Sequence, residues 1–306
     1  GRCRIHLLKS ISDPSTKSGV NVMSEIKTIL LPFNNHQPAA VTIDAAHRVA
    51  SRFESYIEGA YYRQLMPIIA GEGITLPGDY LAEFEEEGRL QAERAASTFK
   101  ALSEERGLPF GTLQEHSSTA RAGWSEMVGT GPSGIGEYAR LFDLSVVARN
   151  DSEATIDWKT TVEAVLFESG RPVLVVGDWV PDSLGHRIVI AWNGSTESAR
   201  SVLAAMPFLS ASDEVVVVEV TGGMVPGPAA AQVAQHLKHR GLVARSETIT
   251  KRDGSIGMAV LEFAETLNAD LLIKGAFTHS RLRQLIFGGA TREILESAPI
   301  PTLFCH

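Results

Sequence analysis

The chain contains one pattern of strands and helices twice, and this internal repeat constrains its fold more than any other feature. Residues 26–34 form a β-rich run that ends in an aromatic residue and Asn34, and residues 186–193 form a similar run that ends in Trp192 and Asn193. A second pair of apolar runs begins at Asp143 and Asp270, and a third pair begins at Pro172 and Pro301. We therefore expect one α/β domain present in two copies.

The spacing of these landmarks locates an insertion. Asn34 and Asn193 are 159 residues apart, whereas Asp143 and Asp270 are 127 apart and the third pair, at prolines 172 and 301, is 129 apart. The first interval exceeds the others by about 30 residues. The first copy should therefore carry an insertion before Asp143, and we place it at residues 64–106, which include the acidic run 83–87.

These intervals divide the chain into three segments. We expect an N-terminal tail or added extension at residues 1–22, a first copy at 23–180 and a second copy at 181–306. Residues 1–22 carry scattered Arg and Lys around a short apolar patch. They lack the continuous apolar stretch of about 7 to 15 residues that a signal peptide needs.

The second copy alternates strands and helices. The sequence predicts strands at 187–192, 214–219, 243–250, 270–274 and 301–305, and helices at 195–209, 229–240, 257–267 and 292–297. Alternation of this kind predicts a mostly parallel sheet with helices on both faces. Ligands of such sheets bind at the carboxyl ends of the strands, near the point where the strand order reverses.

Composition excludes several classes of protein. Hydrophobic residues make up 44% of the chain and charged residues 21%, which is typical of a folded protein. No apolar run reaches the roughly 18 residues that cross a bilayer, so we expect a soluble protein. The net charge of -8 argues against nucleic-acid binding. Two cysteines, Cys3 and Cys305, are too few for a disulfide framework, and a reducing cytoplasm is the expected location.

The loop after the fourth strand of the second copy is the most informative segment. Gly275 stands at the strand end, and Gly288 and Gly289 precede a helix that should open near Ala290. Glycines let the backbone approach a ligand closely, and their N–H groups together with a helix N-terminus suit a phosphate. Two arginines of the loop, at positions 281 and 283, could also meet an anion.

These features together resemble the universal stress protein family in its tandem-domain form. The resemblance rests on the two copies, on Asn193-Gly194-Ser195 after a strand, and on the glycine loop followed by Ala-Pro-Ile-Pro at 298–301. It covers residues 24–306 and is strongest in the second half. It implies two five-stranded parallel sheets with helices on both faces, the adenine nucleotide alpha hydrolase-like fold. It also implies that the copies pair through their last strands and that some members bind ATP or AMP.

The resemblance implies a nucleotide site in the second copy. Carried over position by position, its residues are Ala191, Asn193, Gly194, Val220, Gly275, Thr278, Gly288, Gly289, Ala290 and Thr291. Gly275 and Gly288 match the first and third glycines of the family's loop, and Val220 matches a residue packed beside adenine.

Three positions depart from the family pattern. Thr278 replaces the second glycine, Gly289 replaces a Ser or Thr, and Asn193 replaces an Asp near the ribose or metal. Loss of the Asp argues against Mg²⁺, which prefers carboxylate and phosphate oxygens. A β-branched Thr278 cannot readily adopt positive φ. The hydroxyls of Thr278, Ser280 and Thr291 could still serve a weaker or AMP-like ligand.

Other motifs are given structural interpretations. The first copy's corresponding loop, residues 148–157, has no glycine and three acidic residues, so we expect no nucleotide there. Residues 129–134 match GxGxxG, but no good strand is expected before them, so we interpret them as a loop with Ser133 capping a helix. His236 and His239 lie three apart on a helix, and without a third ligand we expect surface residues. We expect an exposed His279 and a core Cys305.

These observations lead to one function and two alternatives. We expect a non-catalytic stress-response module whose second copy can bind ATP or AMP, because no catalytic triad, carboxylate pair or Walker lysine can be assembled. A slow ATP hydrolase is one alternative, and an interaction scaffold that docks through the insertion is another. The copies should form an internal pseudo-dimer through the strands ending at Val176 and Cys305, because an edge strand left open is a liability. Whether two chains form a homodimer, and which proteins are partners, stays open.

Overall fold

The structure is a computed structural model that describes residues 25–33, 38–65, 78–114, 118–129, 133–149, 158–251, 254–276 and 289–306. Within these ranges no helix combines the length and the apolar character that crossing a membrane requires.

The elements of the first half are β1 (Thr28–Pro32), α1 (Ala39–Phe53), β2 (Tyr56–Gln64), α2 (Gly78–Glu105), β3 (Arg121–Gly129), α3 (Gly134–Tyr138), the 3-10 helix η1 (Ala139–Leu141), β4 (Leu144–Ala148), α4 (Trp158–Glu168) and β5 (Val173–Val176).

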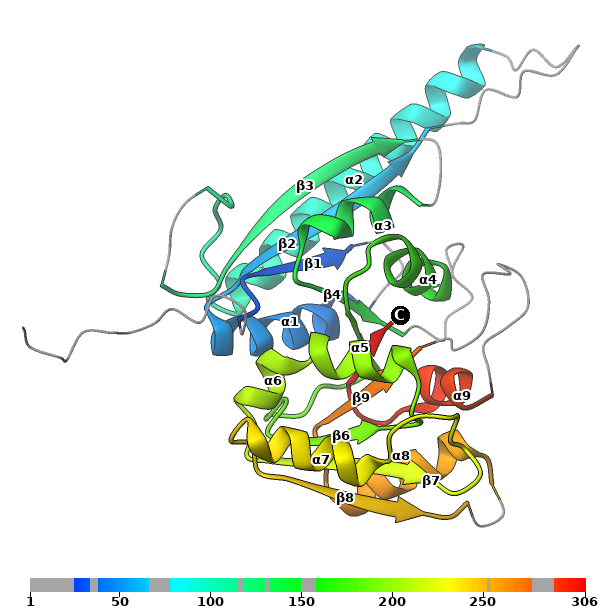
Figure 1. The fold of residues 1–306 in the computed structure, drawn as a ribbon. Helices are drawn as coiled ribbons and strands as arrows, with labels where there is room; N and C mark the ends of the chain where they lie inside the picture. Colours follow the sequence, from blue (N-terminus) through cyan, green and yellow to red (C-terminus); the bar gives the residue numbers. More distant parts are fainter. Residues whose placement is uncertain are drawn as a thin grey trace, which may run out of the picture.

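The second half repeats this order. Its elements are β6 (Arg187–Ala191), α5 (Thr196–Ala204), α6 (Met206–Ser210), β7 (Glu214–Val220), α7 (Ala230–His239), β8 (Ala244–Ile249), α8 (Ile256–Thr266), β9 (Leu271–Gly275), α9 (Gly289–Ser297) and β10 (Thr302–Cys305). Figure 1 shows the two halves side by side, with blue to green elements in one and yellow-green to red elements in the other.

All ten strands belong to one sheet, in the order β3-β2-β1-β4-β5-β10-β9-β6-β7-β8. Each half contributes five strands that pair in parallel. The halves meet where β5 and β10 pair antiparallel, with Leu174 opposite Leu303. This arrangement confirms the expected α/β fold class and the internal pseudo-dimer through the last strands.

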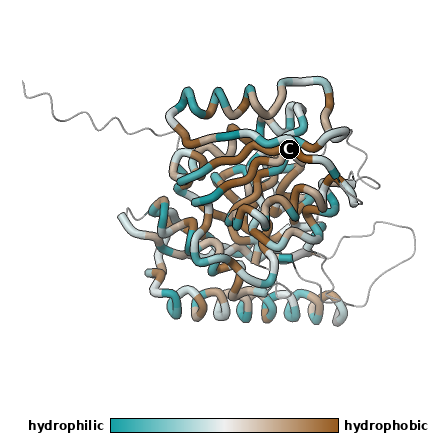
Figure 2. Tube along the Cα trace, turned by 90° about the horizontal axis from the view of Figure 1, so that it is seen from below, coloured by the Kyte–Doolittle hydropathy of each residue, from teal (hydrophilic) through white to brown (hydrophobic). Residues whose placement is uncertain are grey.

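Helices cover both faces of the sheet, which makes the strands the centre of the core (Figure 2). One hydrophobic cluster joins the sheet to α1, α2, α6 and α7, and a second joins the opposite face to α3, α4, α8 and α9. In β7, Val215, Val216, Val217 and Val218 are all fully buried. A continuous apolar run is what a strand covered on both faces requires.

The helices of the second half differ from the prediction in two places. The helix expected at 195–209 is two helices, α5 and α6, because Pro207 lies at the start of α6 and cannot continue the hydrogen bonding of α5. The helix expected from 292 begins earlier, at Gly289. The insertion assigned to 64–106 contains α2, which has 28 residues where the second half has the 10-residue α7. Its bounds, like the domain bounds, stay predictions.

The repeated aspartates have the same structural role in both halves. Asp143 precedes β4, and its Oδ2 accepts hydrogen bonds from the backbone N–H of Lys27 at 2.9 Å and of Thr28 at 3.0 Å. Asp270 precedes β9 and accepts from the backbone N–H groups of residues 185, 186 and 187 at 2.9 to 3.1 Å. Each carboxylate thereby ties the start of its strand to the start of the neighbouring strand, and Asp270 is buried.

We predict that Asp270→Asn lowers the free energy of unfolding by about 2 to 4 kcal/mol. The substitution removes the negative charge and replaces one accepting carboxylate oxygen by an amide NH₂, which cannot accept the hydrogen bonds of the backbone N–H groups it faces. Urea denaturation of the full chain measures this change. The exposed Asp213 provides the matched control, and Asp213→Asn should change stability by less than about 0.5 kcal/mol. Equal effects of the two variants would contradict the assigned role of Asp270.

Candidate functional site

The predicted site lies where the strand order of the second half reverses. From β6 the chain proceeds outward to β7 and β8, and β9 then pairs with the other side of β6. Ala191 is the last residue of β6, opposite Val218 on one side and Lys274 on the other. Val220 ends β7, and Gly275 ends β9. Ala191, Val220 and Gly275 therefore share the carboxyl edge of the sheet, where α/β folds bind ligands.

The turn after β6 is held by its own side chains. Asn193 Oδ1 accepts hydrogen bonds from Ser195 N–H at 3.2 Å and from Ser198 Oγ at 2.6 Å. Ser195 caps α5, and its Oγ accepts a hydrogen bond from Ser198 N–H at 3.2 Å. The amide oxygen of Asn193 is thus already used within the protein.

Gly194 is required by packing as well as by backbone geometry. Its φ is +85°, a region that L side chains rarely adopt, and a Cβ there would lie 2.9 Å from the carbonyl of Val225. Val225 N–H donates to Asn193 O at 2.9 Å, and Trp192 Nε1 donates to Pro228 O at 2.7 Å. The segment between β7 and α7 therefore packs directly on this turn.

Gly275 and Gly289 have different surroundings. A Cβ on Gly275 would lie 2.5 Å from Ser198 N and 2.7 Å from the carbonyl carbon of Glu197, so the end of β9 packs directly on the first turn of α5. A Cβ on Gly289 would meet no atom of the described residues within 4 Å. Gly289 is exposed at the start of α9, followed by the half-buried Ala290 and the buried Thr291. Thr278 and Gly288, with Ser280, Arg281 and Arg283, lie outside the described residues.

Two charged residues at this edge were not predicted. Lys274, one residue before Gly275, is 7% exposed, and its Nζ donates to Gly275 O at 2.7 Å. Burial lowers the pKa of Lys274 to about 8, against the opposing effect of the negative charge on Glu197. Glu197 lies in the first turn of α5 and is 9% exposed. The one feature of the sequence that could have indicated a charged group at this edge was a lysine in the otherwise apolar run of β9.

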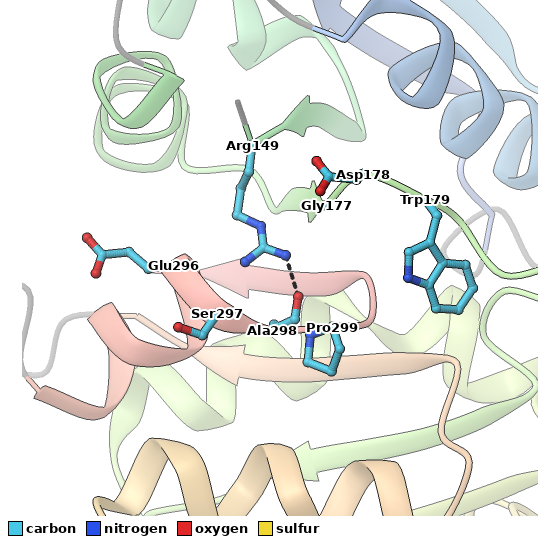
Figure 3. Close-up of a pocket in the computed structure, with 8 residues that line it drawn as sticks. All are labelled: Arg149, Gly177, Asp178, Trp179, Glu296, Ser297, Ala298 and Pro299. Carbon is cyan, nitrogen blue, oxygen red and sulfur yellow. Dashed lines mark hydrogen bonds between the residues drawn. The ribbon is translucent and has the colours of Figure 1, made fainter. Parts of the chain in front are cut away.

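The first half's strand ends are used differently. Arg149 follows β4 and donates from Nη2 to Ala298 O of the second half, as Figure 3 shows. A cavity of about 260 Å³ lies at this junction, lined by Arg149, Gly177, Asp178, Trp179, Glu296, Ser297, Ala298 and Pro299. Nearby, Lys159 of α4 pairs with Glu296 of α9 at 2.6 Å. The residue that follows β4 thus helps to join the two halves.

The other motifs have structural roles where they are described. The expectation that no good strand precedes the GxGxxG motif is wrong, because β3 runs up to Gly129. A Cβ on Gly129 or Gly134 would collide with the ring or hydroxyl of Tyr62, at 2.1 and 2.2 Å, so both glycines make room for that side chain. Ser133 stands at the N-cap of α3, but its side chain makes no capping hydrogen bond.

The remaining candidates are placed as follows. His236 and His239 are exposed on α7, whereas His279 lies outside the described residues. Cys305 is buried in β10, as expected of a core residue, and burial raises the pKa of its thiol. The acidic run 83–87 lies on α2, where its glutamates are exposed.

We predict that Lys274→Met stabilises the protein by about 3 kcal/mol at pH 7, because the variant no longer buries a charge. Below pH 8 the folded and unfolded chains both carry the proton on Lys274, so the whole penalty is present. As pH rises from 8 toward 10.5, the folded chain loses that proton while the unfolded chain keeps it, so the advantage of the variant should disappear. Urea denaturation at pH 7 and pH 10 measures both values.

The exposed Lys238 of α7 supplies the control. Lys238→Met should show no pH-dependent gain in stability between the same two pH values. A Lys274→Met protein that is less stable than the parent at pH 7 would instead show that the buried ammonium is stabilised where it lies.

Comparison with known proteins places this geometry in a family. A sequence profile of the universal stress protein family matches residues 185–306. A universal stress protein from Archaeoglobus fulgidus DSM 4304 has a similar structure, with a TM-score of 0.60 and 16% identity over 91% of this chain and 97% of that one. A search of the curated proteins found no match.

Two further structures are less similar. One, from Pseudomonas aeruginosa UCBPP-PA14 and assigned provisionally to the same family, has a TM-score of 0.49 and 15% identity over 93% of this chain and 95% of that one. Another, a universal stress protein in complex with cAMP, has a TM-score of 0.27 and 18% identity over 50% of this chain and 98% of that one. Residues 185–306 therefore belong to the universal stress protein family, and the whole chain has that family's α/β fold in a two-copy form.

Proposed function

We propose that this protein is a non-catalytic stress-response module of the cytoplasm whose second half binds an adenine nucleotide, ATP or AMP. The observation that carries the proposal is Gly289, the first residue of α9, where no atom of the described residues lies within 4 Å of an added Cβ. The N–H groups of a helix's first turn have no partner within the helix, and its dipole favours an anion. A phosphate group fits that position.

The strand ends beside α9 suit the rest of such a ligand. Ala191 and Val220 end β6 and β7 and belong to the same hydrophobic cluster as the core residues of α8 and α9. Small and branched apolar side chains at this edge provide a surface on which a purine can pack. The oxygen of Asn193 is held by Ser195 and Ser198, so AMP without a metal is a better fit than ATP with Mg²⁺.

A docking role for the first half is a second candidate, favoured by the shape of α2. Figure 1 shows the start of α2 projecting beyond the strands, and Tyr80 and Leu81 there are 51% and 39% exposed. Deleting residues 64–106 would not test this role, because Phe99 of the same segment is fully buried in the core. Substitution of Tyr80 and Leu81 by serine leaves the core intact and is the appropriate variant for partner capture.

Gly289→Val provides the test of nucleotide binding. The added Cβ meets no atom of the described residues within 4 Å and the side chain occupies the space proposed for the phosphate, so we expect AMP affinity to fall at least about tenfold with little change in stability. Isothermal titration calorimetry with AMP, ATP and ATP with Mg²⁺ measures the affinities. Ala211→Val, at an exposed position after α6, is the control and should bind like the parent.

Two outcomes would contradict the proposal. The parent protein giving no heat with millimolar AMP or ATP would leave only a structural or docking role. ATP turnover that persists through purification and disappears in Gly289→Val would favour the slow hydrolase instead.

A further inference from the structure

The first turns of α8 and α9 touch each other at the carboxyl edge of the sheet (Figure 1). A Cβ on Gly257, in the first turn of α8, would lie 2.9 Å from the carbonyl oxygen of Ala290, in the first turn of α9. A Cβ on Gly223, shortly after β7, would lie 3.0 Å from the side chain of Ile256, the first residue of α8. The segment after β7 and the starts of both helices therefore converge beside the candidate site.

Glu293 of α9 places a carboxylate at the start of α8. Its Oε2 accepts a hydrogen bond from the hydroxyl of Ser255, the N-cap of α8. The same oxygen lies 2.5 Å from the position that a Cβ on Gly257 would take. Ser255 in turn accepts a hydrogen bond from the backbone N–H of Met258 at 3.2 Å. The partial positive charge of the α8 N-terminus thus already faces a carboxylate of the protein.

Glu293 also lies one helical turn after Gly289, the first residue of α9. Residues four apart share one face of a helix and are about 5 to 6 Å from each other, and helical side chains lean toward the N-terminus. The negative charge of Glu293 therefore lies close to the position proposed for a phosphate group at Gly289.

The described basic residues beside Glu293 pair with a different carboxylate. Arg292 donates from Nε to both oxygens of Glu296 at 3.2 Å, and Lys159 of α4 pairs with the same glutamate at 2.6 Å. Glu293 is half-buried, so solvent and salt screen its charge less than that of a fully exposed glutamate. A ligand at the start of α9 therefore meets a negative charge that no ion pair among the described residues offsets.

We propose that Glu293 selects the ligand of the second half by charge, so that a nucleoside monophosphate binds and the corresponding di- and triphosphates are disfavoured. Each further phosphate adds negative charge near the start of α9, where Glu293 repels it. The N-terminus of α8, the neighbouring position that would favour an anion, already faces Glu293 itself. Discrimination between related ligands often depends on such a repulsive element. This inference rests on the proposed function and names the charge class of its ligand.

Calorimetric titration with AMP, ADP and ATP, all without Mg²⁺, tests the role of Glu293. For the parent protein we expect affinity to fall with each added phosphate, and AMP to bind at least about tenfold more tightly than ATP. Glu293→Gln keeps an oxygen that can accept from Ser255 but removes the charge. ATP affinity should then rise at least about fivefold, and AMP affinity by about twofold at most. Glu293→Asp keeps the charge and should keep the preference for AMP.

A matched variant and a change of salt provide the controls. Glu265→Gln removes an exposed charge near the other end of α8 and should leave the ratio of AMP to ATP affinity unchanged. Raising NaCl from about 0.1 M to 1 M shortens the screening length from roughly 10 Å to 3 Å. The preference of the parent for AMP should therefore weaken at high salt, and that of Glu293→Gln should change less.

The outcomes separate this inference from the function on which it rests. Failure of the parent protein to bind AMP or ATP at millimolar concentration would overturn both. Equal affinity of the parent for AMP and ATP, or an unchanged ratio in Glu293→Gln, would overturn the role of Glu293 alone. AMP affinity is the internal measure of folding, because a misfolded variant loses AMP as well. In that case Glu293→Met, which buries no polar group, replaces the variant, and an unchanged ratio there would again overturn the role.

Discussion

The antiparallel pairing of β5 with β10 is the interaction on which the whole architecture depends. Each half ends in a strand of four buried residues, and each terminal strand would be an exposed edge in a separate domain. Their pairing places Leu174 opposite Leu303 and Val173 opposite Phe304, so the sheet and its core continue from one half into the other. The repeat in the sequence thus becomes a single ten-stranded sheet with edges only at β3 and β8.

This pairing also explains why the halves use their strand ends differently. Because the strands are antiparallel at the junction, β5 ends beside the start of β10, and Val175 lies opposite Thr302. The residue that follows β4, Arg149, is therefore close enough to donate to Ala298 just before β10. In the first half this position joins the two halves, whereas the equivalent position of the second half, after Gly275, is the fully buried core residue Ala276.

Local sequence patterns predicted the central strands well, because residues covered on both faces must be apolar. They failed for β3, an edge strand in which half-buried and exposed residues such as Glu126 and Val128 interrupt the apolar run. The resemblance to the universal stress protein family placed Ala191, Val220 and Gly275 at the ends of strands, and the structure has them there. The burial of Glu197 and Lys274 could not be predicted from the sequence, because it depends on the tertiary packing around α5 and β9.

The glycines at the carboxyl edge show why a motif in the sequence does not by itself define a ligand site. Gly275 would be needed in the absence of any ligand, because a side chain there would collide with the backbone of α5. Gly194 is likewise required by its φ of +85°. Gly289 differs, because no atom of the described residues lies within 4 Å of a Cβ placed there. Packing therefore accounts for Gly194 and Gly275, and the support for a ligand lies at Gly289 instead.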